Sequence, residues 1–205
     1  MQGFVLNVKR VKSEDLLVTV LTERKIKKLY RFYGVRHSAV NLGFKIDFVA
    51  EPVQNKNILR LKDLMHLGFS WLHDSYRLGI WQNFLSILNL HLQDTDEIDP
   101  FYYELLCNYA DIFEQSNPKR LIIEAFLKIQ KFEGTASRYD FCFICDKPTA
   151  ENVSIGKGFM IAHHECLGSY KFAKKPTVEL ITEGRTIYFE NDEVDRLYEI
   201  TQKGF

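Results

Sequence analysis

The first sixty residues alternate between apolar and polar positions over short segments, as β-strands do. Four such segments lie at residues 4–8, 16–22, 25–33 and 44–49. Residues 16–22 are apolar almost throughout and are predicted to be buried on both faces, whereas the other segments have one polar face. Four or five short strands in about 60 residues favour a small closed barrel.

Apolar residues then recur every three or four positions, which is the pattern of amphipathic helices. Residues 64–92 predict one long helix, or two with a break near Gly68 or Gly79. Asp99 and Asn117 are each followed by a proline, a combination that caps and begins a helix. Short connections between these helices predict an antiparallel bundle with the leucine and aromatic stripes in its core.

The last part of the chain changes character twice. Residues 140–170 are rich in glycine and polar turns and carry three of the four cysteines. Residues 178–181 and 186–189 flank Gly184 and predict the two strands of a β-hairpin. Residues 192–202 predict a short closing helix.

The chain holds 27 Lys and Arg against 27 Asp and Glu, but these charges are unevenly distributed. Residues 1–62 have thirteen basic and five acidic residues, and residues 63–205 have fourteen and twenty-two. A basic first third followed by an acidic remainder suggests two modules with different partners. No segment predicts a signal peptide or a membrane span, so we expect a cytoplasmic protein.

The sharpest chemical signal is a C-x2-C pair, Cys142 and Cys145, followed after seventeen residues by His163, His164 and Cys166. Two close pairs of soft or borderline ligands joined by a loop suit tetrahedral zinc. We predict Zn²⁺ bound by Cys142, Cys145, His163 and Cys166. His164 is the alternative nitrogen ligand. His163 is preferred because two residues separate it from Cys166, the same spacing as in the first pair. Four protein ligands leave no open position, so the predicted metal is structural.

The sequence leaves three other interpretations of this segment open. The cysteines could be buried or free thiols beside surface histidines. They could also form a redox C-x-x-C, although the βαβ context of thioredoxins is absent. His163-x-Glu165 resembles half of the motif of zinc nucleobase deaminases, but the order is reversed and Cys166 would crowd the open position.

Residues 24–37 carry six Lys and Arg with three aromatic residues among them. Clustered cations neutralise phosphates, and aromatic faces stack on unpaired bases. The competing interpretation is a solvated strand face whose aromatic side chains belong to the barrel core. The candidate DNA contacts are Lys9, Arg10, Lys12, Arg24, Lys25, Lys27, Lys28, Arg31 and Arg36.

Motifs of the common nucleotide-binding and hydrolytic enzymes are missing. The chain has no G-x4-G-K-[ST] loop, no G-x-G-x-x-G and no G-x-S-x-G. The acidic residues 94–99 lack calcium-loop spacing and predict a loop that enters a helix. We therefore do not expect an enzyme.

The order of these parts resembles the RecO family of bacterial DNA repair and recombination mediators. Similar segments are Gly3–Leu6, Glu14–Thr22, Tyr33–Arg36 and, as the helix that leads into the zinc motif, Glu124–Gly134. The chain departs from many members because His163 takes the place of a third cysteine and because it is shorter. Its residues after 176 also predict strands where the family continues in helices.

The resemblance implies an α+β chain with an OB-fold DNA-binding domain in residues 1–65 and a helical domain in residues 66–205. A zinc knuckle would be embedded in the helical domain at residues 140–170. The implied partners are single- and double-stranded DNA, RecR and single-strand-binding protein, with RecA as an indirect partner and no membrane.

The implied role is to help load RecA onto DNA coated by single-strand-binding protein and to anneal complementary strands, close to the nucleoid. The alternative is a zinc-stabilised OB-fold protein that binds RNA. A third possibility is an interaction scaffold that binds no nucleic acid.

Overall fold

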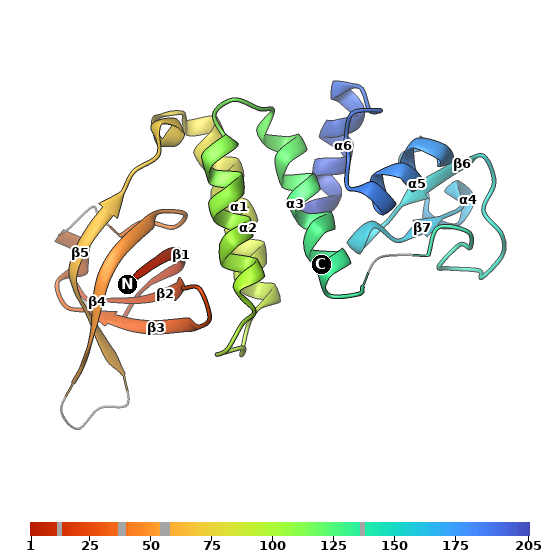
Figure 1. The fold of residues 1–205 in the computed structure, drawn as a ribbon. Helices are drawn as coiled ribbons and strands as arrows, with labels where there is room; N and C mark the ends of the chain where they lie inside the picture. The colour runs from red at the N-terminus through yellow and green to blue at the C-terminus, as the bar shows by residue number, and fades with distance from the viewer. Residues whose placement is uncertain (12–13, 37–39, 54–57, 136–137) are drawn as a thin grey trace. The chain divides into compact units, whose positions relative to one another are not determined.

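The computed structural model describes residues 1–11, 14–36, 40–53, 58–135 and 138–205 (Figure 1). They form two compact units, residues 1–115 and 116–205. The sequence predicts a domain boundary at residue 65, whereas the compact unit that contains the barrel extends to residue 115 and includes the two following helices. None of the helices described is both long and apolar enough to cross a membrane.

The first unit begins with a closed barrel of five strands, as predicted. The strands are β1 (Gln2–Arg10), β2 (Leu16–Leu21), β3 (Ile26–Arg31), β4 (Lys45–Pro52) and β5 (Leu59–Leu67), and a short 3₁₀ turn, η1 (Gly34–Arg36), follows β3. Their spatial order is β1-β2-β3-β5-β4, and β4 pairs back to β1. Only β3 and β5 pair in parallel. Five strands closed in this way agree with the OB fold.

Alternate side chains of each strand fill the barrel. The buried interior consists of Val5, Leu16, Val18, Val20, Leu29, Val40, Ile46, Phe48 and Leu61. On β3 only Leu29 is fully buried. Because side chains alternate between the two faces of a strand, Lys27 and Arg31 lie on the inner face with Leu29, and Lys28 and Tyr30 lie on the outer face.

Two helices, α1 (Ser75–His91) and α2 (Pro100–Ile112), follow a 3₁₀ turn, η2 (Ser70–His73). The prediction of helix from residue 64 is wrong, because residues 64–67 complete β5 and pair with β4. The predicted break between two helices is not found, because Gly68 follows β5 and precedes η2, and Gly79 lies inside α1. The predicted cap at Asp99 is confirmed, since its Oδ1 accepts a hydrogen bond from the backbone N of Phe101 at 2.9 Å.

The aromatic stripe of α1 packs against the barrel. The indole of Trp81 is fully buried and its Nε1 donates to the carbonyl of Gly43 at 3.0 Å. Gly43 has φ +90°, and a Cβ there would approach Trp81 to 3.0 Å. The ring of Phe4 on β1 lies 6.0 Å from that of Trp81. These contacts explain why α1 forms one compact unit with the barrel.

The second unit contains four helices and a three-stranded sheet in the order β7-β6-β8. Its elements are α3 (Pro118–Phe132), β6 (Asn152–Ile155), η3 (Lys157–Phe159), β7 (Ile161–Ala162), α4 (His164–Leu167), β8 (Phe172–Ala173), α5 (Lys174–Glu183) and α6 (Asn191–Thr201). The predicted cap at Asn117 is confirmed, because its side chain accepts from the backbone N of Lys119 and Arg120.

The β-hairpin predicted around Gly184 is wrong, because residues 174–183 form α5. Thr177, Leu180 and Ile181 are the buried residues of this segment, and their spacing is helical rather than alternating. Gly184, with φ +68°, ends the helix in the left-handed conformation that favours glycine. The predicted closing helix is confirmed as α6.

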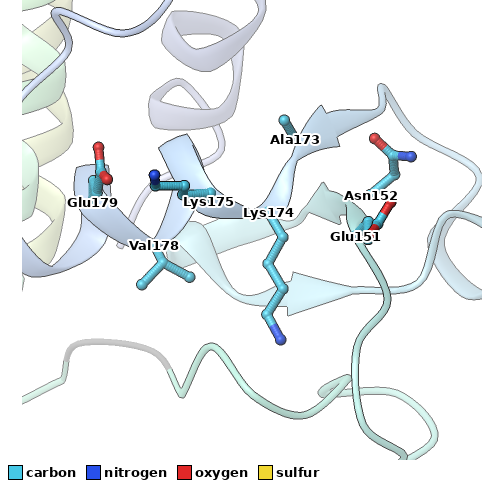
Figure 2. Close-up of a pocket in the computed structure, with 7 residues that line it drawn as sticks. All are labelled: Glu151, Asn152, Ala173, Lys174, Lys175, Val178 and Glu179. Atoms are coloured by element: carbon cyan, nitrogen blue, oxygen red, sulfur yellow. The ribbon is translucent and has the colours of Figure 1, made fainter.

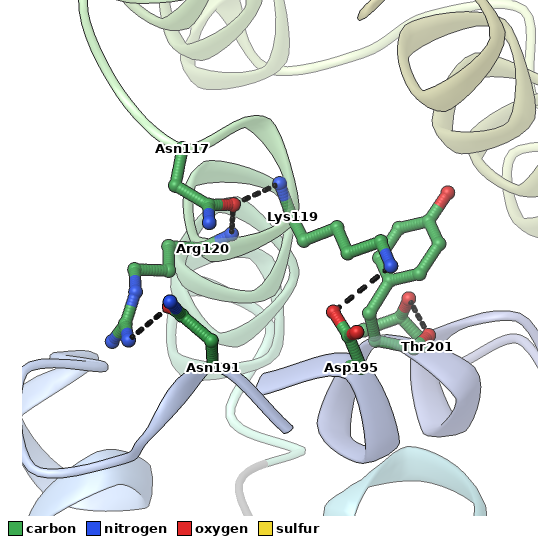
Figure 3. Close-up of polar contacts among 7 residues, drawn as sticks. Asn117, Lys119, Arg120, Asn191, Asp195 and Thr201 are labelled. Atoms are coloured by element: carbon green, nitrogen blue, oxygen red, sulfur yellow. Dashed lines mark hydrogen bonds and ion pairs between the residues drawn. The ribbon is translucent and has the colours of Figure 1, made fainter. Parts of the chain in front are cut away.

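The connection between α5 and α6 is fixed by one arginine of α3. Arg120 donates to the carbonyls of Thr186 and Phe189 at 2.5 and 2.7 Å, and to Oδ1 of Asn191 at 3.2 Å. Figure 3 shows the contact of Arg120 with Asn191 together with the ion pair between Lys119 of α3 and Asp195 of α6, which is 2.9 Å long. The carbonyls that Arg120 binds belong to a segment without regular structure, so the arginine replaces the missing backbone hydrogen bonds there.

Candidate metal centre and nucleic-acid interface

The structure brings together the four residues that the sequence predicts as metal ligands. The ligand atoms of Cys142, Cys145, His163 and Cys166 all lie within 4.8 Å of one another. Nδ1 of His163 is 3.3 Å from Sγ of Cys145 and 3.8 Å from Sγ of Cys166. Zinc bonds of about 2.3 Å to sulfur and about 2.0 Å to nitrogen place tetrahedral ligands about 3.6–3.8 Å apart, so the group could hold one zinc ion.

Two turns position these ligands. Between the first pair and β6, the backbone N of Cys142 donates to the carbonyl of Lys147 at 2.9 Å, and that of Asp146 to the carbonyl of Cys142 at 2.9 Å. Gly158, with φ +63°, reverses the chain between β6 and β7. The backbone N of His163 then lies 3.4 Å from Sγ of Cys142, which joins the two ligand pairs.

The geometry favours His163 over His164 as the nitrogen ligand. Nε2 of His163 lies 2.9 Å from the carbonyl of Pro148, a contact in which Nε2 is the donor. That hydrogen bond leaves the lone pair of Nδ1 directed towards the thiols. His164 instead places its Nδ1 3.4 Å from Oγ of Ser154.

The protonation of the group is uneven. Burial raises the pKa of the Cys142 thiol, but the backbone amides of Cys145, His163 and Ile144 outweigh burial and lower it to about 6. Burial, followed by hydrogen bonds from Cys145 and Cys142, raises the pKa of Cys166 to about 11. The carbonyl of Pro148, and then Cys145, raise the pKa of His163. A metal that binds at neutral pH must therefore displace protons from Cys166 and His163.

The cysteine pair is not oxidised, because all four cysteines of the chain are free thiols. Glu165, the acid/base candidate of the deaminase interpretation, is exposed. Cys166 occupies the fourth ligand position within the cluster. The arrangement is therefore that of a closed four-ligand site rather than one with a position for a reacting water.

An open pocket of about 700 Å³ lies beside β8 and α5 in the same unit (Figure 2). It is lined by Glu151, Asn152, Ala173, Lys174, Lys175, Val178 and Glu179. Lys174 and Val178 extend to the same side of α5 in the picture. Two lysines and two glutamates give this lining no net charge, and it contains no cysteine or histidine.

On the barrel, one row of the outer face crosses four strands and contains two basic residues, one aromatic residue and one leucine. The pairing Lys9↔Leu17, Leu17↔Tyr30 and Tyr30↔Arg60 crosses β1, β2, β3 and β5. Lys9 and Lys28 are exposed, and Lys28 lies on the same outer face two residues from Tyr30. Lys9, Lys28 and Arg60, the outer-face cations, are available to a ligand on this side.

Other predicted DNA contacts have structural roles or different positions. Arg31 donates from Nη1 to the carbonyl of Leu61 at 3.0 Å and so joins β3 to β5. Lys27 and the turn residues Arg24 and Lys25 line a pocket of about 420 Å³ with Tyr103. Arg10 is exposed at the end of β1. The side chain of Arg36 and the whole of Lys12 lie outside the described structure.

The acidic connector between α1 and α2, residues 94–99, lies along the turn between β2 and β3. Nζ of Lys25 is 3.1 Å from Oε1 of Glu97. The backbone N of Ile26 donates to the carbonyl of Asp96 at 2.9 Å, and that of Ile98 to the carbonyl of Arg24 at 3.0 Å. Carboxylates of the same unit therefore already face part of the predicted basic segment.

The three aromatic residues of the basic segment do not fill the barrel. Tyr30 and Phe32 are half-buried, with ring centroids 4.8 Å apart, and Tyr33 is 60% exposed. The hydroxyl of Tyr30 donates to Asp15 at 2.5 Å, and this hydrogen bond raises the pKa of Tyr30. Tyr33 is the most exposed of the three.

Sequence reasoning missed the cations of β5. The guanidinium of Arg60 lies 5.1 Å from the ring centroid of Phe32, and Lys62 pairs with Glu51 at 3.2 Å. Both alternate with Leu59 and Leu61, which is the signal of a strand. Assigning the neighbouring residues to a turn and a helix concealed that signal.

Comparison with protein families agrees with the barrel. Residues 1–72 match the family model described as RecO N terminal, and this segment contains all five barrel strands. A sequence comparison with curated proteins found no match. The match covers about a third of the chain and relates its barrel to the N-terminal domain of the RecO family.

Proposed function

We propose that this protein is a recombination mediator that binds DNA through its barrel and acts without catalytic turnover. The observation that carries the proposal is the coincidence of the RecO N-terminal match with a five-stranded barrel that bears cations on its outer face. Lys9, Lys28 and Arg60 would neutralise phosphates there. No base-specific contact is required, since a mediator acts on DNA of any sequence.

The cysteine cluster would hold Zn²⁺ through Sγ of its three cysteines and Nδ1 of His163. The ion supplies a cross-link between the turn at residues 142–148 and the turn at 163–166. Two short strands and a four-residue helix have little core of their own, and a structural metal is the usual means of stabilising such a segment.

The proposed biological role is to help load RecA onto single strands coated by single-strand-binding protein and to anneal complementary strands together with RecR. The missing nucleotide-binding loop supports a role without nucleotide hydrolysis. A zinc-stabilised barrel protein that binds RNA is the alternative, because a basic barrel face accepts either backbone.

The test is a salt titration of binding to labelled single-stranded DNA, duplex DNA and single-stranded RNA of equal length, with zinc content measured on the same preparation. We expect DNA binding that weakens steeply with salt and about one zinc per chain. Absence of DNA binding at low salt, or a strong preference for RNA, would contradict the mediator proposal.

A further inference from the structure

The cysteine-bearing turn and the strand end that faces it expose large apolar side chains. Phe141, Phe143, Ile144 and Met160 are 45, 46, 48 and 38% exposed. Phe141, Phe143 and Ile144 lie next to the buried Cys142 in the sequence, and Met160 directly precedes β7. Exposed apolar side chains that gather in one place mark a binding surface more often than isolated ones do.

The rings of Phe141 and Phe143 line one small pocket. Its volume is about 250 Å³, and its lining residues are Thr135, Arg138, Phe141, Cys142, Phe143, Asp146, Met160 and Ile161. The pocket is too small for a peptide helix, and its size suits one planar heterocycle. Arg138 and Asp146 supply a hydrogen-bond donor and an acceptor at its edge.

The ring of Phe143 packs against Gly156. Its Cε1 and Cζ atoms would lie 3.2 and 3.3 Å from a Cβ built on Gly156, so the ring edge rests over the backbone of that glycine. The backbone N of Phe143 is fixed by the carbonyl of Ile161 at 2.9 Å. A ring anchored in this way presents a preorganised face for stacking.

The charges around the pocket favour a polyanion. Residues 138–175 have six Lys and Arg against four Asp and Glu, although residues 116–205 are balanced. Arg138, Lys147 and Lys157 are exposed and form no ion pair within the described part of the chain. Phosphates that flank a stacked base would meet these cations.

We propose that Phe141 and Phe143 form a stacking site for unpaired nucleobases, and so give the second unit a single-strand contact separate from the barrel. This inference rests on the proposed DNA-binding function and names the form of DNA that the second unit would recognise. Bases in a duplex are already stacked on their neighbours, so the site discriminates in favour of single strands.

The first experiment compares Phe141→Ala/Phe143→Ala with wild type in salt titrations of single-stranded and duplex DNA. We expect single-strand affinity to fall at least fivefold, the salt slope to stay the same because no cation is removed, and duplex affinity to be unchanged. Ile144→Ala is the matched control, since Ile144 is equally exposed but does not line the pocket. Zinc content and melting temperature establish that each variant is folded.

The second experiment places an indole at the site with Phe143→Trp. Both native tryptophans, Trp71 and Trp81, are buried, so quenching by added oligodeoxycytidine reports on the new indole. We expect quenching by the single strand and little by duplex of the same length.

If the double alanine variant binds single strands with wild-type affinity and the new indole is not quenched, the stacking site is overturned. The barrel proposal would still stand. The same double variant losing binding to both forms of DNA with a changed salt slope would also overturn the stacking site. A wild type that binds no DNA would instead remove the proposed function itself.

Discussion

The two compact units have the same net charge of zero but reach it differently. In residues 1–115 the charges are segregated, with an excess of eight basic residues in residues 1–62 and of eight acidic residues in residues 63–115. Residues 116–205 hold thirteen of each sign. The acidic excess therefore belongs to the unit that contains the barrel, and not to residues 116–205, which contain the cysteine cluster.

This difference separates two ways of building a site. The first unit gathers like charges on one barrel face, where many weak phosphate contacts add up and depend on salt. The second unit instead brings four specific donor atoms within 4.8 Å, where a single ion would bind with fixed geometry. Substitutions should consequently act on affinity and salt dependence in the first unit, and on folding in the second.

The largest expected effect is from the loss of a metal ligand. Cys142→Ser should abolish zinc binding and unfold much of residues 116–205, because metal binding and folding of such segments are coupled. DNA binding by the barrel should persist. Zinc-to-protein ratio and limited proteolysis measure this, and Cys107→Ser, which alters the cysteine outside the cluster, is the control. Zinc loss with an intact second unit would contradict a structural metal.

The next effect tests the second unit without touching the cluster. Arg120→Ala removes a cation that donates to two carbonyls and one side-chain oxygen, and we expect the unit to lose about 2–4 kcal/mol of stability. Denaturant unfolding should show the loss, and single-strand binding by the barrel should remain. A wild-type midpoint would show that the connection between α5 and α6 needs no such support.

Zinc affinity should also depend on pH. Cys166, with a pKa of about 11, and His163, with a raised pKa, must lose protons to bind, so affinity falls as pH decreases from 8 to 6. About tenfold is expected per pH unit for each proton released. Competition with a chelator at several pH values measures the slope, and a flat profile would show that these groups are not ligands.

The smallest effect belongs to the acidic connector. Asp96→Asn/Glu97→Gln removes two carboxylates from the connector that lies beside Lys25. This double substitution should raise DNA affinity about two- to fivefold at low salt. Glu104→Gln/Asp111→Asn removes the same charge from α2 and should change affinity less. Equal gains from both pairs would mean that net charge alone, and not the contact at the turn, sets affinity.

The elements that could be predicted from the sequence are those determined by short-range patterns of residues. Caps at Asp99 and Asn117 and four barrel strands follow local rules, and all were confirmed. The metal ligands were predictable because spacing alone constrains four donor atoms. That His163 rather than His164 faces the thiols follows from a contact with Pro148 that no spacing reveals.

Two predictions were wrong where local patterns conflict with tertiary structure. Leu64 and Leu67 fit a helical period with residues further on, but pairing with β4 makes them strand. Residues 178–181 look like a short strand in isolation, but burial of Leu180 and Ile181 and the cap at Gly184 complete a helix. Arg31 stays a predicted DNA contact, and its hydrogen bond to Leu61, which joins two strands, depends on tertiary pairing that no local pattern shows.

The most direct test of the account is the salt slope of single-stranded DNA binding for Lys9→Gln/Lys28→Gln/Arg60→Gln. Three lost phosphate contacts should lower the magnitude of the slope by about 2. The control Lys128→Gln/Arg185→Gln/Lys203→Gln, with the same change in net charge in the second unit, should keep the wild-type slope. Equal slopes for wild type and the barrel variant would contradict the claim that the outer face of the barrel binds DNA.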